Sequence, residues 1–259
     1  MAGDFFEATQ KNVPNLNRTE RQLFEYVIKN MDNVKNMSIQ KFAEECFIST
    51  TTVFRFTQKL GFSGYAEFIN SLLVTAHQNK SIKAPEGLYG KSYSEEYLKN
   101  IIETVRVISG KNMAAVSEAL DNVENIYIIA DENSAAAGLY TERLFVGLGF
   151  QAYYLTALYD LQTLPGRVTG RDLIIALSYS GKDTNVLETV ERVLSNEKPF
   201  LMSITRAENN PLESISNVNF YIFADEIHSN GIDLTTSVPS IIVMELLAYM
   251  KVKNLSSID

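Results

Sequence analysis

Hydrophobic residues follow two different spacings along the chain. From Thr19 to about Ala76 they recur every three or four residues, whereas from residue 125 onward they gather in short runs such as "NIYIIA" and "DLIIAL". The first spacing is typical of helices with one buried face, and short apolar runs between polar turns are typical of buried strands. The pattern therefore predicts an all-helical first part and an α/β second part.

Capping residues divide the first part into separate helices. Thr19 is a candidate N-cap for the first helix, and Ser38 and Ser49 are candidate N-caps for two short helices that follow. Gly61 stands at the usual place after a helix end, and a further helix is expected from about residue 65 to 77. Because only "CFI" separates the two short helices, this arrangement is typical of a helix-turn-helix.

The second short helix carries side chains suited to reading DNA. Such a helix lies in the major groove with its first turn against the base edges. Thr50, Thr51 and Thr52 are short enough for that approach. Arg55, one turn further on, can reach a guanine edge or a phosphate. The alternative interpretation is a plain helical bundle with a threonine-rich cap.

Other residues are candidates for contacts with the DNA backbone, which position a protein without specifying sequence. Lys41, Lys59 and the loop at 63–65 carry suitable donors. The complete predicted DNA-binding set is Ser38, Lys41, Ser49, Thr50, Thr51, Thr52, Arg55, Lys59, Ser63 and Tyr65.

The turn between the two short helices contains an unusual residue. Phe47 stands where glycine is common, and a positive φ is costly for a bulky side chain. We therefore expect a differently shaped turn with the Phe47 ring packed into the core. Its neighbour Cys46, the sole cysteine, is expected to be a small buried hydrophobic residue rather than a nucleophile.

The second part of the chain predicts a parallel sheet. Residues 78–93 are polar, contain Pro and Gly and lack a clear period, so they are expected to be a linker between domains at 1–77 and 94–259. Strands alternating with helices indicate a mainly parallel sheet covered on both faces. Expected strands are 125–130, 151–155, 172–177, 199–204 and 218–223. Expected helices are 94–109, 114–120, 134–149, 184–195, 210–216 and 235–253.

Two loops of this second part are candidate ligand sites. "ADENSAAA" follows the first expected strand, and "SYSGKDT" (178–184) follows the third. Ligands of open parallel sheets collect at the carboxyl ends of strands, near helix N-termini that attract anions. The hydroxyls of Ser178, Ser180 and Thr184 and the close approach allowed by Gly181 suit an anion such as a sugar phosphate. The alternative is that Ser180 or Asp183 simply caps the helix that begins at Thr184.

Taken together, the chain resembles the RpiR-type family of bacterial transcription regulators over nearly its full length. The resemblance rests on "LNRTERQLFEYVIKN", "MSIQKFAEECFISTTTVFRFTQKLGFSGYAEF" and "DLIIALSYSGKDTNVLETVERV", which follow the family pattern in order. It implies a helix-turn-helix domain joined to an αβα sugar isomerase (SIS) domain that senses phosphosugars. It also implies a homodimer or dimer of dimers that reads a two-fold operator in double-stranded DNA.

The family's phosphate-binding motif is present with departures. SIS domains usually have S-x-S-G-x-T, and Ser178, Ser180 and Gly181 match it, but Asp183 takes the threonine position. The first loop has "ADENS" in place of a glycine-rich G-x-G-x-S, so that only Ser134 matches. The expected ligand-binding residues are Ser134, Ser178, Tyr179, Ser180, Gly181, Asp183 and Thr184.

These departures leave three interpretations of the sensor site. The carboxylates of Asp131, Glu132 and Asp183 face solvent and a phosphosugar still binds, or they bind sugar hydroxyls, an amino group or a bridging cation. In the third, the site has lost its ligand and the domain only dimerises. An isomerase with Glu188 as base and His228 as proton shuttle is the competing enzyme hypothesis, although a regulator without catalytic residues is expected.

Composition and charge narrow the class of protein further. The net charge is −8, with nine basic and eight acidic side chains in residues 1–80 against 14 and 23 in the rest. The first part is not a basic patch, so DNA binding rests on geometry. A single cysteine fits a reducing cytoplasm, and no signal peptide, membrane span, cofactor or metal-ligand cluster is expected.

Overall fold

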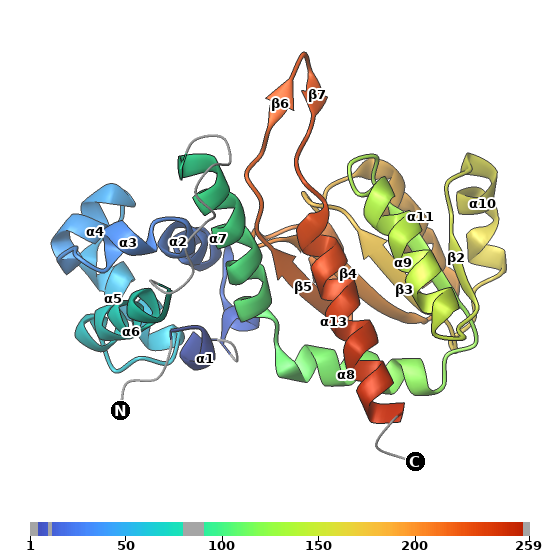
Figure 1. The fold of residues 1–259 in the computed structure, drawn as a ribbon, viewed down its shortest axis with the longest axis horizontal. Coiled ribbons are helices and arrows are strands. Elements are labelled where there is room, and N and C mark those ends of the chain that lie inside the picture. Colours follow the sequence, from blue (N-terminus) through green and yellow to red (C-terminus); the bar gives the residue numbers. More distant parts are fainter. Residues whose placement is uncertain (1–4, 10–11, 80–90, 256–259) are drawn as a thin grey trace. The chain divides into compact units, whose positions relative to one another are not determined.

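A computed structural model describes residues 5–9, 12–79 and 91–255 (Figure 1). Contacts between residues divide the chain into two compact units. The first unit contains the residues up to Lys99 together with 207–209, and the second contains the other residues from Asn100 onward. Residues 80–90 of the predicted linker lie outside the described residues, and the helix that follows begins at Lys91. The predicted domain boundaries therefore remain a prediction.

The first unit is all-helical, as the hydrophobic spacing predicted. In this unit the described elements are α1 (Phe5–Thr9), η1 (Val13–Asn15), α2 (Arg18–Lys29), α3 (Met31–Val34), α4 (Ile39–Glu45), α5 (Thr50–Lys59) and α6 (Tyr65–Asn79). The prediction of Thr19 as the first N-cap is wrong. Asn17 caps α2 instead, because its side chain accepts from the Glu20 amide (3.0 Å) while Glu20 Oε2 accepts from the Asn17 amide (2.7 Å).

A cluster of aromatic rings holds the first unit together. Phe68 of α6 lies at its centre. The rings within 5.7–6.3 Å of the Phe68 ring, between centroids, include Phe5, Phe42, Phe56 and Phe62. The Phe5 amide also donates to Thr75 Oγ1 (3.0 Å), which fixes α1 against α6. Because Phe42 and Phe56 belong to α4 and α5, the same cluster sets the angle between these two helices.

The second unit is the predicted α/β domain. Helix α7 (Lys91–Val107) runs across the division between the units. The helices of the second unit are α8 (Gly110–Asp121), α9 (Ala135–Gly147), α10 (Leu158–Thr163), η2 (Leu164–Gly166), α11 (Thr184–Asn196), α12 (Pro211–Ile215) and α13 (Val238–Leu255). Its strands are β1 (Ile126–Ala130), β2 (Ala152–Tyr154), β3 (Leu173–Leu177), β4 (Phe200–Arg206), β5 (Val218–Ile222), β6 (His228–Ser229) and β7 (Ile232–Asp233). All five predicted strands are confirmed, whereas α10 and the β6–β7 hairpin are elements that the hydrophobic pattern did not indicate.

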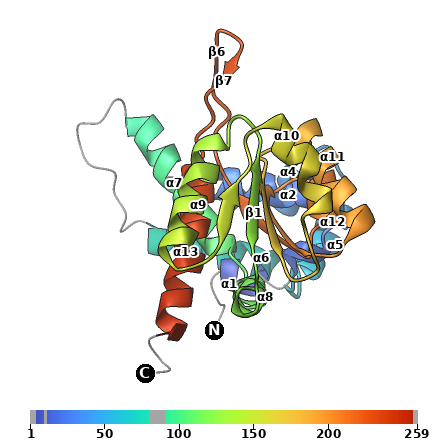
Figure 2. The ribbon, with the colours of Figure 1, turned by 90° about the vertical axis from the view of Figure 1, so that its right-hand side faces the viewer.

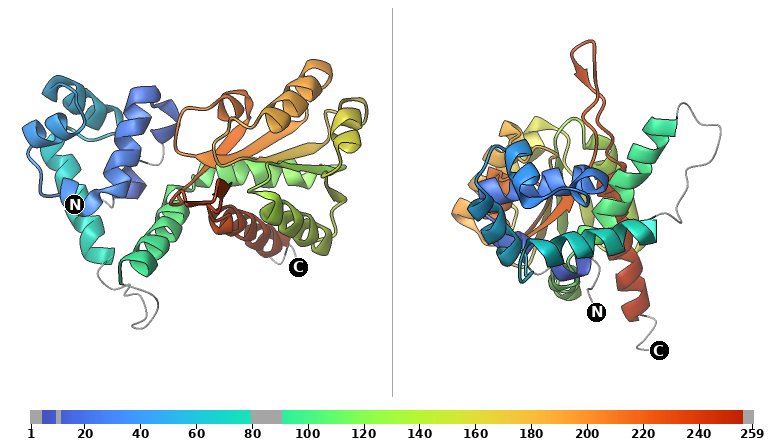
Figure 3. Two further views of the ribbon diagram at one scale, coloured as in Figure 1. Left: turned by 90° about the horizontal axis from the view of Figure 1, so that it is seen from above. Right: turned by 90° about the vertical axis from the view of Figure 1, so that its left-hand side faces the viewer.

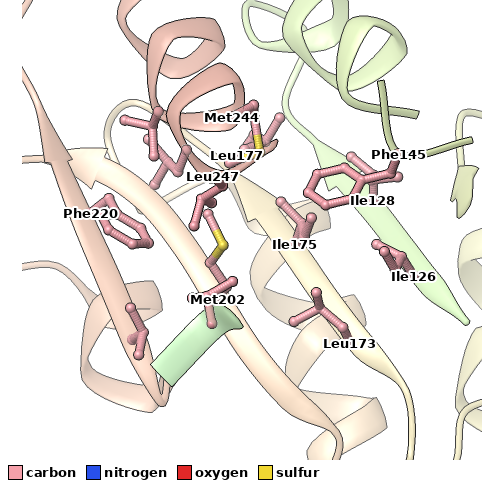
Figure 4. Packing of buried hydrophobic residues seen from close by; sticks show 14 of the residues in the cluster. Ile126, Ile128, Phe145, Leu173, Ile175, Leu177, Met202, Phe220, Met244 and Leu247 are labelled. Atoms are coloured by element: carbon pink, nitrogen blue, oxygen red, sulfur yellow. The ribbon is translucent and has the colours of Figure 1, made fainter. Parts of the chain in front are cut away.

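In the described part of the chain, β1 to β5 form one parallel sheet with the strand order β2-β1-β3-β4-β5. Helices α9 and α13 cover one face, and α10, α11 and α12 cover the other (Figure 2 and Figure 3). On the first face Phe145, Met244 and Leu247 pack against strand residues that include Ile128, Ile175 and Met202 (Figure 4). The predicted αβα class is therefore correct.

The strand order determines where a ligand would bind. The chain leaves β1 toward the β2 edge and then crosses back to β3, so the crevice between β1 and β3 is the switch point of the sheet. Loops that follow neighbouring strands on either side of a switch point diverge and leave room for a ligand. Here these are the loops that follow Ala130 and Leu177, which are paired across the two strands.

Candidate DNA-binding and effector sites

The two predicted serine caps fix the beginnings of α4 and α5. Ser38 Oγ accepts from the Lys41 amide (3.2 Å), and Ser49 Oγ accepts from the Thr52 amide (3.1 Å). The Thr52 hydroxyl lies 2.9 Å from the Ser49 hydroxyl. These interactions confirm the predicted caps, and they give the Ser49 and Thr52 hydroxyls a structural role at the beginning of α5, the helix that was predicted to face DNA.

The surface of α5 separates into a buried and an exposed face. Val53, Phe56 and Thr57 are buried in the first unit, while Thr50, Thr51 and Arg55 are exposed. Among the described residues the Arg55 guanidinium has no hydrogen-bond or ion-pair partner. An arginine with five unused donors on an exposed helix face is available for a guanine edge or a phosphate.

The two lysines predicted to contact the DNA backbone are already paired. Lys41 Nζ lies 3.0 Å from Glu45 Oε1 on the same helix, and Lys59 Nζ lies 2.5 Å from Glu20 Oε2 of α2. Both lysines remain exposed, so a phosphate can replace the carboxylate partner. Their contribution to DNA affinity is then an exchange of partners rather than a new interaction.

The loop after α5 is also internally bonded. The Ser63 amide and hydroxyl both donate to Glu67 Oε2 (2.7 and 2.6 Å), and these bonds lower the pKa of Glu67. The Tyr65 hydroxyl donates to the Met37 carbonyl (3.1 Å), and burial raises the pKa of Tyr65 to about 12. Both residues therefore shape the loop, and their predicted contacts with DNA remain a prediction.

The prediction for the turn between α4 and α5 is wrong. Phe47 adopts the left-handed conformation (φ 54°) and is 96% exposed rather than packed in the core. The Phe47 amide donates to the Glu44 carbonyl (3.1 Å) and the Ile48 amide to the Ala43 carbonyl (2.9 Å). This pair of bonds is the Schellman motif, which requires a left-handed residue directly after the helix end. The helix ending therefore decides the conformation of Phe47, and burial of its ring does not.

Phe54, next to the buried Val53 on α5, is 42% exposed. Its ring lies at a surface hollow of about 310 Å³, whose lining residues are Ile39, Gln40, Thr50, Thr51 and Phe54. The hollow lies at the first turns of α4 and α5, where base edges are read in a helix-turn-helix. Ile39, Gln40 and Phe54 are thus candidate DNA-facing residues that were absent from the predicted set.

Replacing Phe47 by glycine is expected to stabilise α4 and α5. Glycine removes the cost of a left-handed side chain, about 1–2 kcal/mol, and an exposed ring has little packing to lose. Part of this gain is offset by about 0.5–1 kcal/mol because glycine is more flexible in the unfolded chain. Slower amide hydrogen exchange in α4 and α5 of the full-length protein is the expected result. Phe47→Ala keeps the Cβ atom and should give no gain, and faster exchange in Phe47→Gly would show that the ring makes stabilising contacts.

Cys46 beside this turn is not activated. Two effects raise the pKa of its thiol to about 11: burial is the larger, and the nearby Glu45 carboxylate is the smaller. A thiol with such a pKa is protonated at neutral pH and is a poor nucleophile.

In the second unit, the loops after β1 and β3 are joined at the switch point. The Asp131 amide donates to the Leu177 carbonyl (3.0 Å), so that the beginning of one loop lies against the beginning of the other. Ser178 follows Leu177 directly and is 1% exposed, and its hydroxyl has no hydrogen-bond partner among the described residues. Because a buried polar group without a partner is costly, its position next to a switch point indicates a ligand site.

Gly181 holds the second loop against α12. It has φ +62°, and a Cβ atom there would lie 2.1 Å from Asn210 Oδ1. The side chain of Asn210 is itself buried and takes part in two hydrogen bonds. Its Oδ1 accepts from the Glu213 amide (2.8 Å) and caps α12, while its Nδ2 donates to Thr205 Oγ1 (3.0 Å). The predicted close approach at Gly181 is therefore an approach to Asn210, a partner that the motif did not indicate.

Two carboxylates of this site accept from backbone amides, and one of them caps a helix. Asp183 Oδ1 accepts from the Val186 amide (2.9 Å) and caps α11, which confirms the capping alternative. Asp131 Oδ1 accepts from the Ser134 amide (2.9 Å) at the beginning of α9. Glu132 is exposed, and Ser134 is buried.

The other predicted ligand residues divide into exposed and internally bonded ones. Ser180 Oγ accepts from the Lys182 amide (3.1 Å), and Thr184 is exposed as the first residue of α11. The Tyr179 hydroxyl donates to the Ala224 carbonyl (2.7 Å), which ties the loop to the segment after β5. Tyr179 thus has a structural role in this loop, whereas Ser180 and Thr184 border the switch point.

The two residues of the isomerase hypothesis lie on different elements, and no hydrogen bond or ion pair joins them in the described part of the chain. Glu188 is exposed on α11, and His228 is exposed on β6, where its Nε2 lies 4.0 Å from Asp233 Oδ2. In the part of the chain that the structure describes, no group of three or more His, Cys, Asp or Glu side chains could hold a metal ion. Within the same ranges, no helix is long and apolar enough to cross a membrane.

Comparison with known proteins identifies both units. Residues 5–78 match the helix-turn-helix domain of the rpiR family, and residues 119–250 match the SIS domain. The chain is 27% identical over 250 residues to an uncharacterized HTH-type transcriptional regulator of Clostridium perfringens, covering 93% of this chain and 89% of that protein. It is 24% identical over 258 residues to the HTH-type transcriptional regulator GlvR of Bacillus subtilis, covering 98% of both chains.

Solved structures share the fold. The NanR protein of Vibrio vulnificus, solved in complex with ManNAc-6P, has a TM-score of 0.59 at 20% identity and covers 98% of this chain and 93% of that one. The sugar isomerase domain of an RpiR transcription factor from Sphaerobacter thermophilus has a TM-score of 0.55 at 18% identity, covering 61% of this chain and 86% of that one.

The two domain matches and the regulators among the relatives define a transcription regulator with a helix-turn-helix domain and an SIS domain. The chain belongs to the RpiR-type family of such regulators, as its motifs indicated.

Proposed function

We propose that this regulator controls genes of carbohydrate metabolism by binding a two-fold DNA site, and that a sugar bound between β1 and β3 changes its affinity for DNA. The observation that carries the proposal is the Ser178 hydroxyl, which is buried without a partner at the switch point of the sheet. The NanR structure, whose ligand is a sugar derivative, supports a sugar as the class of effector.

The exposed face of α5 supports the DNA-binding half of the proposal. Thr50, Thr51 and Arg55 are the base-reading candidates, and Lys41 and Lys59 the backbone candidates. The first turn of α5 is exposed and capped by Ser49, so short side chains there can approach base edges. A dimer would present two such helices to the two halves of an operator.

Exposed apolar side chains on two packed helices support a dimer. Helices α9 and α13 lie side by side, and the Tyr140 hydroxyl donates to Glu245 Oε1 (2.5 Å) between them (Figure 1). The large apolar side chains that these helices expose include Leu139, Val146, Tyr249 and Val252. Apolar groups gathered on neighbouring helices mark protein–protein contacts, and a two-fold dimer uses the same surface on both copies.

Substitution of Ser178 by alanine separates ligand binding from folding. The free protein is expected to be equally stable or up to about 1 kcal/mol more stable, because an unsatisfied buried hydroxyl is removed. In a thermal-shift screen of sugars, a ligand at about 100 times its Kd should stabilise the native protein by about 2.7 kcal/mol, and this stabilisation should be lost in Ser178→Ala.

Ser195→Ala is the matched control for this screen. Ser195 is exposed on α11 and its hydroxyl donates to the Glu191 carbonyl of its own helix (2.8 Å), so its removal should leave every ligand response unchanged. An undiminished response in Ser178→Ala would place the effector elsewhere, and the absence of any response in the native protein would contradict the proposed sensor.

A further inference from the structure

We infer that the effector of this protein is a sugar without a phosphate group, because the Asp183 carboxylate already caps the helix N-terminus where a phosphate would bind, and Asp131 places a second carboxylate in the loop before α9. This inference rests on the sugar site proposed above and names the chemistry of its ligand. It separates this chain from the phosphosugar sensing that its family resemblance implied.

Each of the two loops at the switch point contains a carboxylate that accepts from a backbone amide of the chain that follows it. Asp183 Oδ1 lies 2.9 Å from the Val186 amide at the beginning of α11, and Asp131 Oδ1 lies 2.9 Å from the Ser134 amide at the beginning of α9. Each of these helices has 13 residues, and the free amides of a helix N-terminus are the groups that attract an anion. Because Asp183 accepts from an amide of the first turn of α11, that helix N-terminus has a negative partner before any ligand arrives.

The surrounding charges add to this effect. Glu132 is exposed next to Asp131, so the two loops bring three carboxylates to the switch point. Lys182 is the basic residue of the second loop. Arg206 pairs with Glu226, and its guanidinium lies 5.9 Å from the centre of the Tyr179 ring. Like charges within about 4 Å repel strongly enough to lower the affinity for a phosphate dianion by roughly ten- to a thousand-fold.

The site nevertheless contains one buried hydroxyl without a hydrogen-bond partner, that of Ser178. Its hydroxyl is buried and unpartnered, in the same turn as Asp183 and directly after the residue whose carbonyl accepts from the Asp131 amide. A hydroxyl can donate and accept, whereas ionised carboxylates only accept. Sugar hydroxyls or a sugar ammonium group supply donors for the carboxylates and complete the hydrogen bonding of Ser178. A phosphate dianion supplies no donor.

The test compares the native protein with Asp183→Thr. Threonine also caps a helix, so α11 keeps its beginning, but the negative charge is removed and a hydroxyl takes its place. Thermal shift and calorimetric titration of the full-length protein would use glucose, glucosamine and N-acetylmannosamine, the 6-phosphate of each, and inorganic phosphate. We expect an unphosphorylated sugar to bind the native protein more tightly than its 6-phosphate. In Asp183→Thr, the affinity for the 6-phosphates and for inorganic phosphate should rise about ten- to a thousand-fold.

Glu191→Gln is the control, because Glu191 is exposed two turns further along α11 and its removal should not change phosphate affinity. Tighter binding of a 6-phosphate than of its free sugar by the native protein would overturn the inference and leave the sugar sensor intact. An unchanged phosphate affinity in Asp183→Thr would also overturn it, since the carboxylate would then have no part in ligand choice. The absence of binding by any sugar would overturn both this inference and the proposed function.

Discussion

Replacing Arg55 by alanine is expected to abolish sequence-specific DNA binding. The guanidinium is exposed on the face of α5 that carries Thr50 and Thr51, and it has no partner among the described residues. A bidentate pair with a guanine contributes about 1–3 kcal/mol, and a dimer makes the contact twice. At 1.4 kcal/mol for each tenfold, Kd should therefore rise roughly 30- to 10,000-fold. Fluorescence anisotropy with the DNA upstream of the protein's own gene measures this change.

Arg171→Ala is the matched control for the loss of one positive charge. Arg171 lies before β3, where its Nη1 is 2.8 Å from Glu124 Oε1, and its side chain is 72% exposed. Its replacement should leave Kd unchanged. If Arg55→Ala bound the same DNA as tightly as the native protein does, α5 would not be the recognition helix.

Replacing Gly181 by alanine is expected to unfold the effector site. The new Cβ atom would lie 2.1 Å from Asn210 Oδ1, and φ +62° is unfavourable for alanine. The conformational cost is about 1–2 kcal/mol. Displacement of the buried Asn210, which caps α12 and donates to Thr205, adds about 1–3 kcal/mol. For a unit of this size the combined loss lowers Tm by about 5–15 °C, which differential scanning calorimetry would measure.

Gly149→Ala separates the two causes of this loss. Gly149 also has a left-handed conformation (φ +89°), but nothing lies within 4 Å of the position that a Cβ atom would take. Only the conformational cost of about 1–2 kcal/mol is then expected. Equal changes in Tm for the two variants would show that Asn210 moves away without cost.

Local signals in the sequence were sufficient for most of the fold. The serine caps at Ser38 and Ser49 and the glycine at Gly61 were predicted correctly, because capping depends on neighbouring residues alone. The five strands of the sheet were predictable because each is a short apolar run, and β1 and β3 at its centre are buried on both faces. In contrast, the β6–β7 hairpin has exposed and polar residues, and its strands are too short to show a period.

The errors have one local cause and several tertiary ones. Phe54 was absent from the predicted DNA-facing set, but the surface formed by α4 and α5 leaves it 42% exposed. Phe47 was expected to avoid a left-handed conformation, but the Schellman bonds that end α4 require one at this position. In the sensor site, the serine motif was visible in the sequence, whereas the unpartnered hydroxyl of Ser178 and the contact between Gly181 and Asn210 depend on distant elements.

The most direct test of a sugar-controlled DNA-binding protein is its affinity for DNA with and without sugar. The anisotropy titration with upstream DNA would be repeated at saturating concentration of the sugar that gives the largest thermal shift. If the sugar binds the DNA-bound and the DNA-free protein with different affinities, it must change the Kd for DNA by the same factor, typically 5- to 150-fold. We predict such a change for the native protein and none for Ser178→Ala. An unchanged Kd for the native protein, with the sugar bound, would contradict control of DNA binding by this site.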